Sequence, residues 1–288
     1  MLEHVDRVQI AVRELDAAAE TFRAVFDATH VRDDELRHAG ARRRVMQAGR
    51  SEFELLAPSS DGLVREYLDA WGEGLFAAGF STKDVPALAQ RLRSKNVAFS
   101  EEGEQLFIAP EQTPGLRIVI SPHVEREPVG LAGYLYEVTN LIGDHEAAAR
   151  FYADTFGLDA SKFSPIVSKQ YGYTGQLTLF NPPDRLSRIE LSQITDPERP
   201  MGRFMTRRGG ETLYMCFIEA EDIEGIVERA KARDMRFVGH DRDGGFHEGL
   251  FFHPSTLHGV LMGVSRTNVA WIWSGRPQLA PASVQRHG

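Results

Sequence analysis

Alternating polar and apolar positions recur along the chain and predict short, half-buried strands, each followed by a helix. Residues 5–12 and 136–142 alternate in this way, and a turn with an acidic residue follows each of them. In the second copy Asp144 stands at the N-cap position of the predicted helix. Residues at helical spacing would form one face of that helix: Ala148, Phe151, Tyr152 and Phe156.

Later segments of the chain also match in pairs, which indicates an internal repeat. The matching pairs are 51–58 with 187–194, 74–100 with 212–239, and 115–122 with 259–265. Together they predict four units of strand-helix-strand-strand-strand, at 5–58, 74–122, 136–194 and 212–265. Residues 123–133, with Pro128 and two glycines, are predicted to link the paired units. The Pro-rich end is predicted to be extended or loose.

Composition narrows the class of protein. Hydrophobic residues make up 42% and charged residues 26% of the 288 residues, and the formal net charge is -8. These values are typical of a soluble globular protein and argue against nucleic-acid binding. Neither a membrane span nor a signal peptide is expected. The single cysteine, Cys216, lies in an apolar run and is expected to be an inert buried thiol in a cytoplasmic protein.

Three phrases carry a resemblance to a known family: FELLAP (53–58), FYADTFGL (151–158) and FFHPSTLHGVL (251–261). The chain resembles the vicinal oxygen chelate superfamily of glyoxalases, bleomycin resistance proteins and extradiol dioxygenases. Its four units are most like the two-domain type I extradiol dioxygenases. The resemblance implies an α+β fold in which four tandem βαβββ modules form two open, cup-like mixed sheets. It places a scaffold-like pair of modules at 1–125, an active or binding pair at 131–266, and an extended tail at 267–288.

Active members of this family usually bind a divalent metal through His and Glu side chains. In the C-terminal pair the matching positions are Glu137, Tyr214 or Met215, and Gly263. The two-histidine, one-carboxylate iron site is therefore missing, and a ring-cleaving iron dioxygenase is not expected. No cofactor is predicted. If a metal is bound, the resemblance leaves Glu137, Glu190 and His247 as its ligands.

Glu137 is the first candidate for chemistry. Its strand alternates, so Glu137 and Thr139 share the face that lines the cavity in the family. A carboxylate in a partly apolar cavity would have a raised pKa, which suits a general acid or base. An ion pair with a nearby arginine is the alternative interpretation. Tyr214 and His247 are its predicted catalytic partners.

Further residues are candidates for contacting a substrate. Tyr171 and Tyr173 would stack on a planar ligand, and Arg203 would bind a carboxylate. The full set of predicted binding residues is Thr139, Tyr171, Tyr173, Glu190, Arg203, Met215 and Phe251.

Two main hypotheses remain open. One is a metal-independent isomerase, lyase or hydrolase acting on a small aromatic or oxygenated molecule by acid/base chemistry. The other is a metal-free protein that sequesters a planar drug or metabolite, with Glu54, Glu137 and the negative net charge favouring a cation. A metalloenzyme with an unusual ligand set comes third. The partner expected is a small molecule, and a homodimer is compatible with the sequence.

Overall fold

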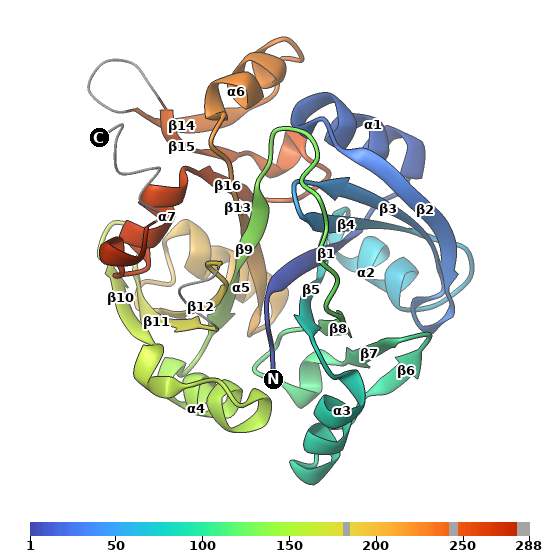
Figure 1. Ribbon diagram of the computed structural model, residues 1–288, viewed down its shortest axis with the longest axis vertical. Coiled ribbons are helices and arrows are strands. Elements are labelled where there is room, and N and C mark those ends of the chain that lie inside the picture. The colour runs from blue at the N-terminus through green and yellow to red at the C-terminus, as the bar shows by residue number, and fades with distance from the viewer. Residues whose placement is uncertain (181–184, 242–246, 281–288) are drawn as a thin grey trace. The chain divides into compact units, whose positions relative to one another are not determined.

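The computed structural model describes residues 1–180, 185–241 and 247–280, and its account of side chains omits residues 240–247. Four copies of a strand-helix-strand-strand-strand module make up this part of the chain (Figure 1). The modules begin and end within two residues of the boundaries that the repeat predicted. No helix in these ranges has the length and hydropathy that a membrane crossing requires.

The first two modules form one eight-stranded mixed sheet in the order β2-β3-β4-β1-β5-β8-β7-β6. The first module contains β1 (Val5–Ala11), α1 (Leu15–Phe26), β2 (Thr29–Leu36), β3 (Ala41–Ala48) and β4 (Ser51–Pro58). Helix α2 (Leu63–Trp71) leads to the second module. That module contains β5 (Gly74–Thr82), α3 (Val85–Ser94), β6 (Ser100–Glu102), β7 (Gln105–Ile108) and β8 (Ile118–Pro122).

The last two modules repeat this arrangement in a second sheet, in the order β10-β11-β12-β9-β13-β16-β15-β14. The third module contains β9 (Tyr134–Ile142), α4 (His145–Phe156), β10 (Ser164–Ser168), β11 (Tyr173–Leu179) and β12 (Arg188–Ile194). Helix α5 (Pro200–Arg208) connects it to the fourth module. That module contains β13 (Thr212–Glu219), α6 (Ile223–Lys231), β14 (Phe237–Asp241), β15 (His247–Phe252) and β16 (Met262–Ser265).

The predicted α+β fold with two mixed sheets is therefore confirmed. One local prediction was wrong: the chain was expected to be extended after residue 266, but Thr267–Trp273 forms helix α7. This helix buries Val269, Ala270 and Trp271, and the segment was misread because its short run of apolar residues is followed by prolines. Residues 281–288 lie outside the described ranges.

Contacts within the chain group it into two compact units. One contains residues 1–5, 77–124 and 137–214, and the other contains 6–76, 125–136 and 215–288. This grouping cuts across the predicted boundaries at 125 and 131, so the two sequential domains stay a prediction. The third module lies almost entirely in the first unit, and the first and fourth modules lie mostly in the second.

The third module shows how local sequence sets the frame of the site. Asp144 caps α4, because its carboxylate accepts hydrogen bonds from the backbone N–H groups of Glu146 and Ala147. The helix packs against β11 and β12 (Figure 1). Its Tyr152 and Phe156 side chains are fully buried. Strand β12 runs parallel to β9 and antiparallel to β11. Successive side chains on each strand therefore alternate between the face towards α4 and the opposite face.

Candidate functional site

A buried ion pair joins the two central strands of the third module. Glu137 on β9 and Arg188 on β12 are register partners, and both side chains are almost fully excluded from solvent. Two guanidinium nitrogens of Arg188, Nε and Nη2, contact Oε2 of Glu137. Thr139 donates a hydrogen bond of 3.0 Å to the other carboxylate oxygen. The structure thus agrees with the ion-pair interpretation of Glu137.

A second carboxyl group lies on the same face, two residues beyond Arg188. Glu190 is 7% exposed, and its Oε1 accepts a hydrogen bond of 2.7 Å from the Ser192 hydroxyl. Burial, and next the negative charge of Glu137, raise the pKa of Glu190 to about 8. Burial and the charge of Glu190 also raise the pKa of the Tyr173 phenol, which is hydrogen-bonded to this carboxyl group. Glu190 can therefore exchange a proton near neutral pH, and Tyr173 stays protonated beside it.

The first module has the same positions with the charges reversed. Arg7 on β1 and Glu52 on β4 are register partners, as are Glu137 and Arg188 in the third module. Arg7 Nη1 lies 2.6 Å from Glu52 and 2.7 Å from Glu54, and Nη2 lies 3.1 Å from Asp6. Three carboxylates therefore surround the Arg7 guanidinium.

Glu54 is the counterpart of Glu190, because each stands two residues after the strand residue that forms the central ion pair. Burial alone would raise the pKa of Glu54, but the charges of Arg7 and Arg43 lower it to about 2. Gln9 donates a further hydrogen bond of 2.8 Å to the same carboxylate. Glu54 is therefore a fixed anion, and this chemistry favours a structural role for the first module.

An aromatic ring takes the place of a metal donor in the fourth module. Phe217 on β13 is the register partner of Gly263 on β16, one of the positions that the resemblance matched to a metal ligand. A Cβ atom on Gly263 would lie only 2.1 Å from the Phe217 ring. Phe251 and Trp273 pack against the same ring, with centroids 5.4 and 6.1 Å away. The space for a carboxylate donor at this position is filled.

The remaining positions also do not fit a divalent metal. The Glu137 carboxylate is bound by Arg188 and Thr139, and burial raises the pKa of the Tyr214 phenol, so that it stays protonated. Within the described ranges, no three His, Cys, Asp or Glu side chains come together as metal ligands could. A guanidinium cation lies beside Glu137, where the family usually binds a metal.

The other predicted residues lie in several different places. Thr139, Tyr173 and Glu190 join Glu137, while Tyr171 and Tyr214 are near one another, with Tyr214 packed on Phe204. Arg203 on α5 is exposed and donates to the carbonyl of Glu198. Met215 and Phe251 belong to the other unit, where Met215 is buried. The side chain of His247, at the start of β15, lies outside the described residues.

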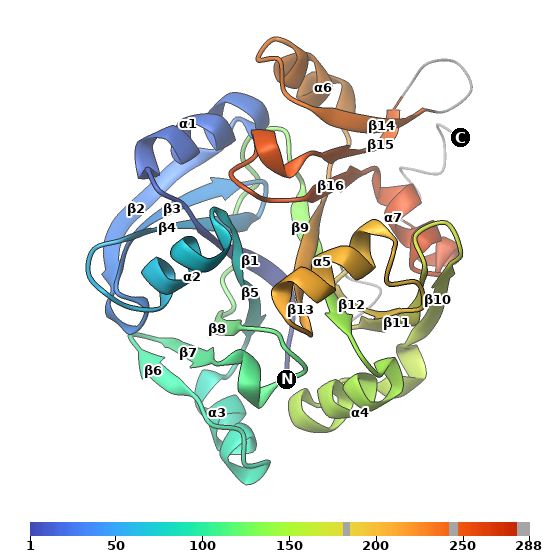
Figure 2. The ribbon, with the colours of Figure 1, turned by 180° about the vertical axis from the view of Figure 1, so that it is seen from behind.

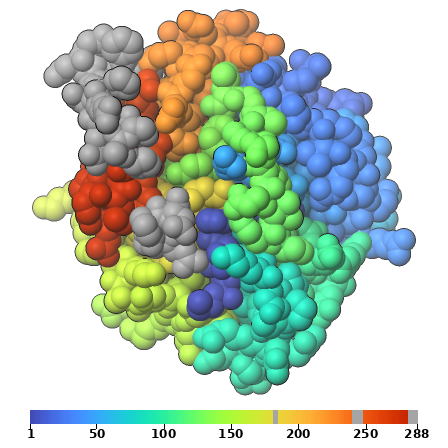
Figure 3. Space-filling model, viewed as in Figure 1, coloured from blue at the N-terminus to red at the C-terminus, as the bar shows by residue number. Residues whose placement is uncertain are grey.

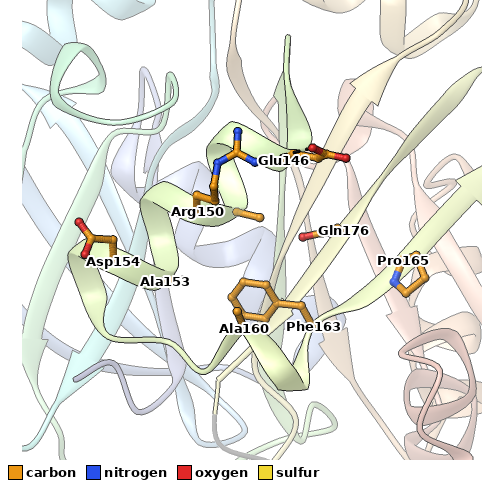
Figure 4. A pocket seen from close by; sticks show the side chains of 9 residues that line it. Glu146, Arg150, Ala153, Asp154, Ala160, Phe163, Pro165 and Gln176 are labelled. Carbon is orange, nitrogen blue, oxygen red and sulfur yellow. Dashed lines mark ion pairs between the residues drawn. The ribbon is translucent and has the colours of Figure 1, made fainter.

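A shallow cavity of about 700 Å³ lies on the other side of the third module, against α4 (Figure 4). Arg150 and Glu146 pair across one helical turn at its edge, and Gln176 and Pro165 point towards it. Gln176 is the register partner of Leu191, whereas Leu177 is the partner of Glu190. By strand alternation the cavity is on the opposite face from Glu190.

Arg188 and Ser192 were missed by the sequence analysis. The register of β9 and β12 brings Arg188 to Glu137, although 51 residues separate the two in sequence. The phrase RIELS (188–192) contained the signal, because a strand that places Arg, Glu and Ser on one face of a buried sheet needs partners for all three.

A solved structure of known function resembles this chain across its whole length. A mutant of 4-hydroxymandelate synthase from Streptomyces coelicolor superposes with a TM-score of 0.71, covering 100% of both chains at 11% sequence identity. At this identity the likeness establishes the fold alone.

Two curated relatives match about half of the chain. Mitochondrial methylmalonyl-CoA epimerase of Mus musculus is 26% identical over 141 residues, which are 48% of this chain and 75% of that protein. The same enzyme of Bos taurus is 24% identical over 156 residues, 53% of this chain and 85% of that protein.

Two family models match the chain, one at residues 6–108 and the other at residues 137–262. Both carry the same description, and together they extend over most of the sequence. The matches agree with the modules seen in the structure and confirm the superfamily that the sequence resembles. The chain belongs to the Glyoxalase/Bleomycin resistance protein/Dioxygenase superfamily.

Proposed function

We propose that the third module catalyses metal-independent proton transfer on a small oxygenated molecule, in the manner of an isomerase or lyase. The observation that carries this proposal is that two neighbouring carboxyl groups have different surroundings. Arg188 neutralises Glu137, whereas the pKa of Glu190 is raised to about 8. A buried carboxyl group whose pKa is raised towards neutrality is a common feature of acid/base sites.

Glu190 takes the role of acid and base in this proposal, and Glu137 positions Arg188 beside it. A general base works best when its pKa is close to the working pH, which is the condition that Glu190 meets. The carboxylate would remove a proton from a carbon next to a carbonyl group, and the C–H electron pair would move onto the carbonyl oxygen as an enolate. Return of the proton to either face completes an isomerisation without any oxidant. Tyr214 keeps its predicted role as a partner, whereas the role predicted for His247 falls on a side chain outside the described residues.

The relatives suggest the substrate class. Both curated relatives are named as epimerases of a CoA ester, and a thioester has an acidic C–H next to its carbonyl group. We therefore propose a carboxylic acid or thioester with such a C–H bond. Sequestration of a cationic ligand has less support, because the carboxylates invoked for it, Glu54 and Glu137, are already paired with arginines.

The test is proton exchange in D₂O with thioesters and 2-oxo acids, followed by the loss of the C–H signal in proton NMR. Glu190→Gln should lower the exchange rate by about 100-fold or more. The same change at the exposed Glu104 should leave it unaltered. The wild-type rate should rise with pH, with a midpoint near 8 and a plateau above it, because only the ionised carboxyl group accepts a proton.

A second measurement needs no substrate. Carbon NMR of a selectively labelled protein should show Glu190 titrating near pH 8, far above an ordinary glutamate. A midpoint between 4 and 5, or wild-type exchange in the glutamine variant, would eliminate Glu190 as the acid/base group.

A further inference from the structure

Helix α5 concentrates positive charge on a negatively charged protein. Residues 199–208 include four arginines and no acidic residue, whereas the whole chain has a net charge of -8. Arg199, Arg203 and Arg207 are spaced by four and therefore follow one face of the helix, and all three are exposed. Asp196 pairs with Arg199 at 3.2 Å, at the start of the helix. Like charges at the spacing of Arg203 and Arg207 destabilise a helix. An anion bound along this face would offset that cost.

Aromatic side chains share this surface. The guanidinium groups of Arg207 and Arg208 lie 5.3 and 5.1 Å from the centroid of the Phe204 ring. Tyr214 packs edge-on against Phe204 at 5.0 Å, and Tyr171 is 42% exposed and electrostatically coupled to Tyr214. Planar cations next to aromatic faces are suited to a ligand that has both phosphates and an aromatic base.

The turn between β10 and β11 packs against the start of α5 and connects this surface, along the chain, to the partner of Glu190. The carbonyl of Gly172, in the turn between β10 and β11, accepts hydrogen bonds from the N–H groups of Thr195 and Asp196, just before α5. A Cβ on Gly172 would come within 2.9 Å of the Arg199 side chain, so the turn is seated on the start of the helix. Tyr171 precedes this glycine, and Tyr173, the partner of Glu190, follows it. Figure 2 shows α5 from the side on which it is most open to view.

We propose that α5 and the β10–β11 turn bind the nucleoside phosphate portion of a carrier-linked substrate. The arginines at 203 and 207 bind the phosphates, and Tyr171, with the Phe204–Tyr214 pair, stacks on the base. Arginine suits this role because its planar guanidinium donates two parallel hydrogen bonds to a phosphate. The substrate would have a nucleoside phosphate at one end and the reacting acyl group at the other. This proposal rests on the proposed function in one respect, that the acyl group reaches Glu190.

The test is calorimetric titration of the full chain with ADP. Arg203→Glu combined with Arg207→Glu should weaken ADP binding by at least ~10-fold, the effect of losing charged hydrogen bonds. Arg65→Glu with Arg150→Glu changes the net charge equally at exposed sites elsewhere, and should leave ADP binding within about twofold. Equal losses in the two double variants would overturn the site. Circular dichroism of each variant checks that it is folded.

Three further titrations identify the ligand chemistry. Tyr171→Ala should weaken ADP binding several-fold and leave pyrophosphate unaffected, since pyrophosphate has no base to stack. If pyrophosphate binds wild type as tightly as ADP, the surface is an ionic patch and the nucleotide proposal fails. If a short RNA binds more tightly than ADP, the ligand is a nucleic acid and the proposal is also wrong.

Glu190→Gln separates this inference from the proposed function. It should bind ADP like wild type while losing proton exchange. If wild type binds ADP but shows no proton exchange with any substrate tested, the nucleotide site is retained and the catalytic role is removed. If wild type shows proton exchange but does not bind ADP, the catalytic role is retained and the nucleotide site is removed.

Discussion

Glu54 and Glu190 occupy equivalent positions in the first and third modules, yet their pKa values are shifted in opposite directions. Two arginines lower the pKa of Glu54 to about 2, whereas burial beside Glu137 raises that of Glu190 to about 8. The reversal follows from one exchange of charge, because Arg7 pairs with Glu52 where Glu137 pairs with Arg188. The same module therefore holds a fixed ionic network in one copy and, in the other, a carboxyl group whose pKa is raised to about 8.

The same substitution at these two positions should therefore have opposite effects on stability. Glu54→Gln leaves Arg7 and Arg43 without a shared anion, and should lower the free energy of unfolding at pH 7 by about 3–5 kcal/mol. Because the folded-state pKa of Glu54 is depressed, wild type should lose its contribution as pH falls from about 4.5 to about 2.

Glu190→Gln should instead stabilise the protein at high pH. The folded-state pKa is raised, so ionisation of wild type costs stability as pH rises from about 4.5 to about 8 and the penalty stays constant above that. Urea unfolding at pH 9 should show the variant more stable, by on the order of 1–3 kcal/mol. A destabilised variant at pH 9 would contradict the assigned pKa.

Removal of the buried cation in the third module should be severe. Arg188→Met leaves Glu137 and Glu190 facing each other without compensation, and should cost about 3–5 kcal/mol at pH 8. The loss should shrink at pH 5, where protonation removes the like-charge repulsion. The control is Arg188→Met with Glu137→Leu, in which an apolar pair replaces the ion pair and most of the stability should return. A double variant as unstable as the single one would show that the ion pair is not the cause.

Glu219 should make stability depend on pH in the fourth module. It is 4% exposed, accepts a hydrogen bond from Thr267 at the start of α7, and has a pKa raised by burial to about 7. Its ionisation therefore destabilises the folded state as pH rises from about 4.5 to about 7. Glu219→Gln should gain on the order of 1–2 kcal/mol over wild type above pH 7 and nothing below 4.5. Parallel stability curves for the two proteins would refute this assignment.

Figure 3 shows α7, in red, at the surface of the protein.

The contact between Gly263 and Phe217 can be tested by a double-mutant cycle. Gly263→Ala should cost about 1–3 kcal/mol, because its Cβ would overlap the Phe217 ring. In a Phe217→Ala background the same change should cost less than about 0.5 kcal/mol. Additive losses would mean that the ring does not fill the position of the missing carboxylate donor.

The sequence alone determined the modular fold. Strand alternation, helical spacing and Asp144 at its N-cap are local properties, and each repeat unit contained all of them, so the module boundaries could be predicted within two residues. The sequence also showed that the usual metal donors are missing at 137 and 263, because this depends only on which residue stands at each motif position. Helix α7 could not be read, since a run of seven residues before prolines has too little periodicity.

Only the tertiary structure decided which carboxyl group has a raised pKa. Glu137 and Glu190 both lie on alternating strands, and their sequence neighbours gave no reason to distinguish them. The register between β9 and β12 places Arg188 on Glu137 and leaves Glu190 beside a second carboxylate. A pKa depends on charges and burial within a few ångströms, and these are set by strands that pair across some fifty residues of chain.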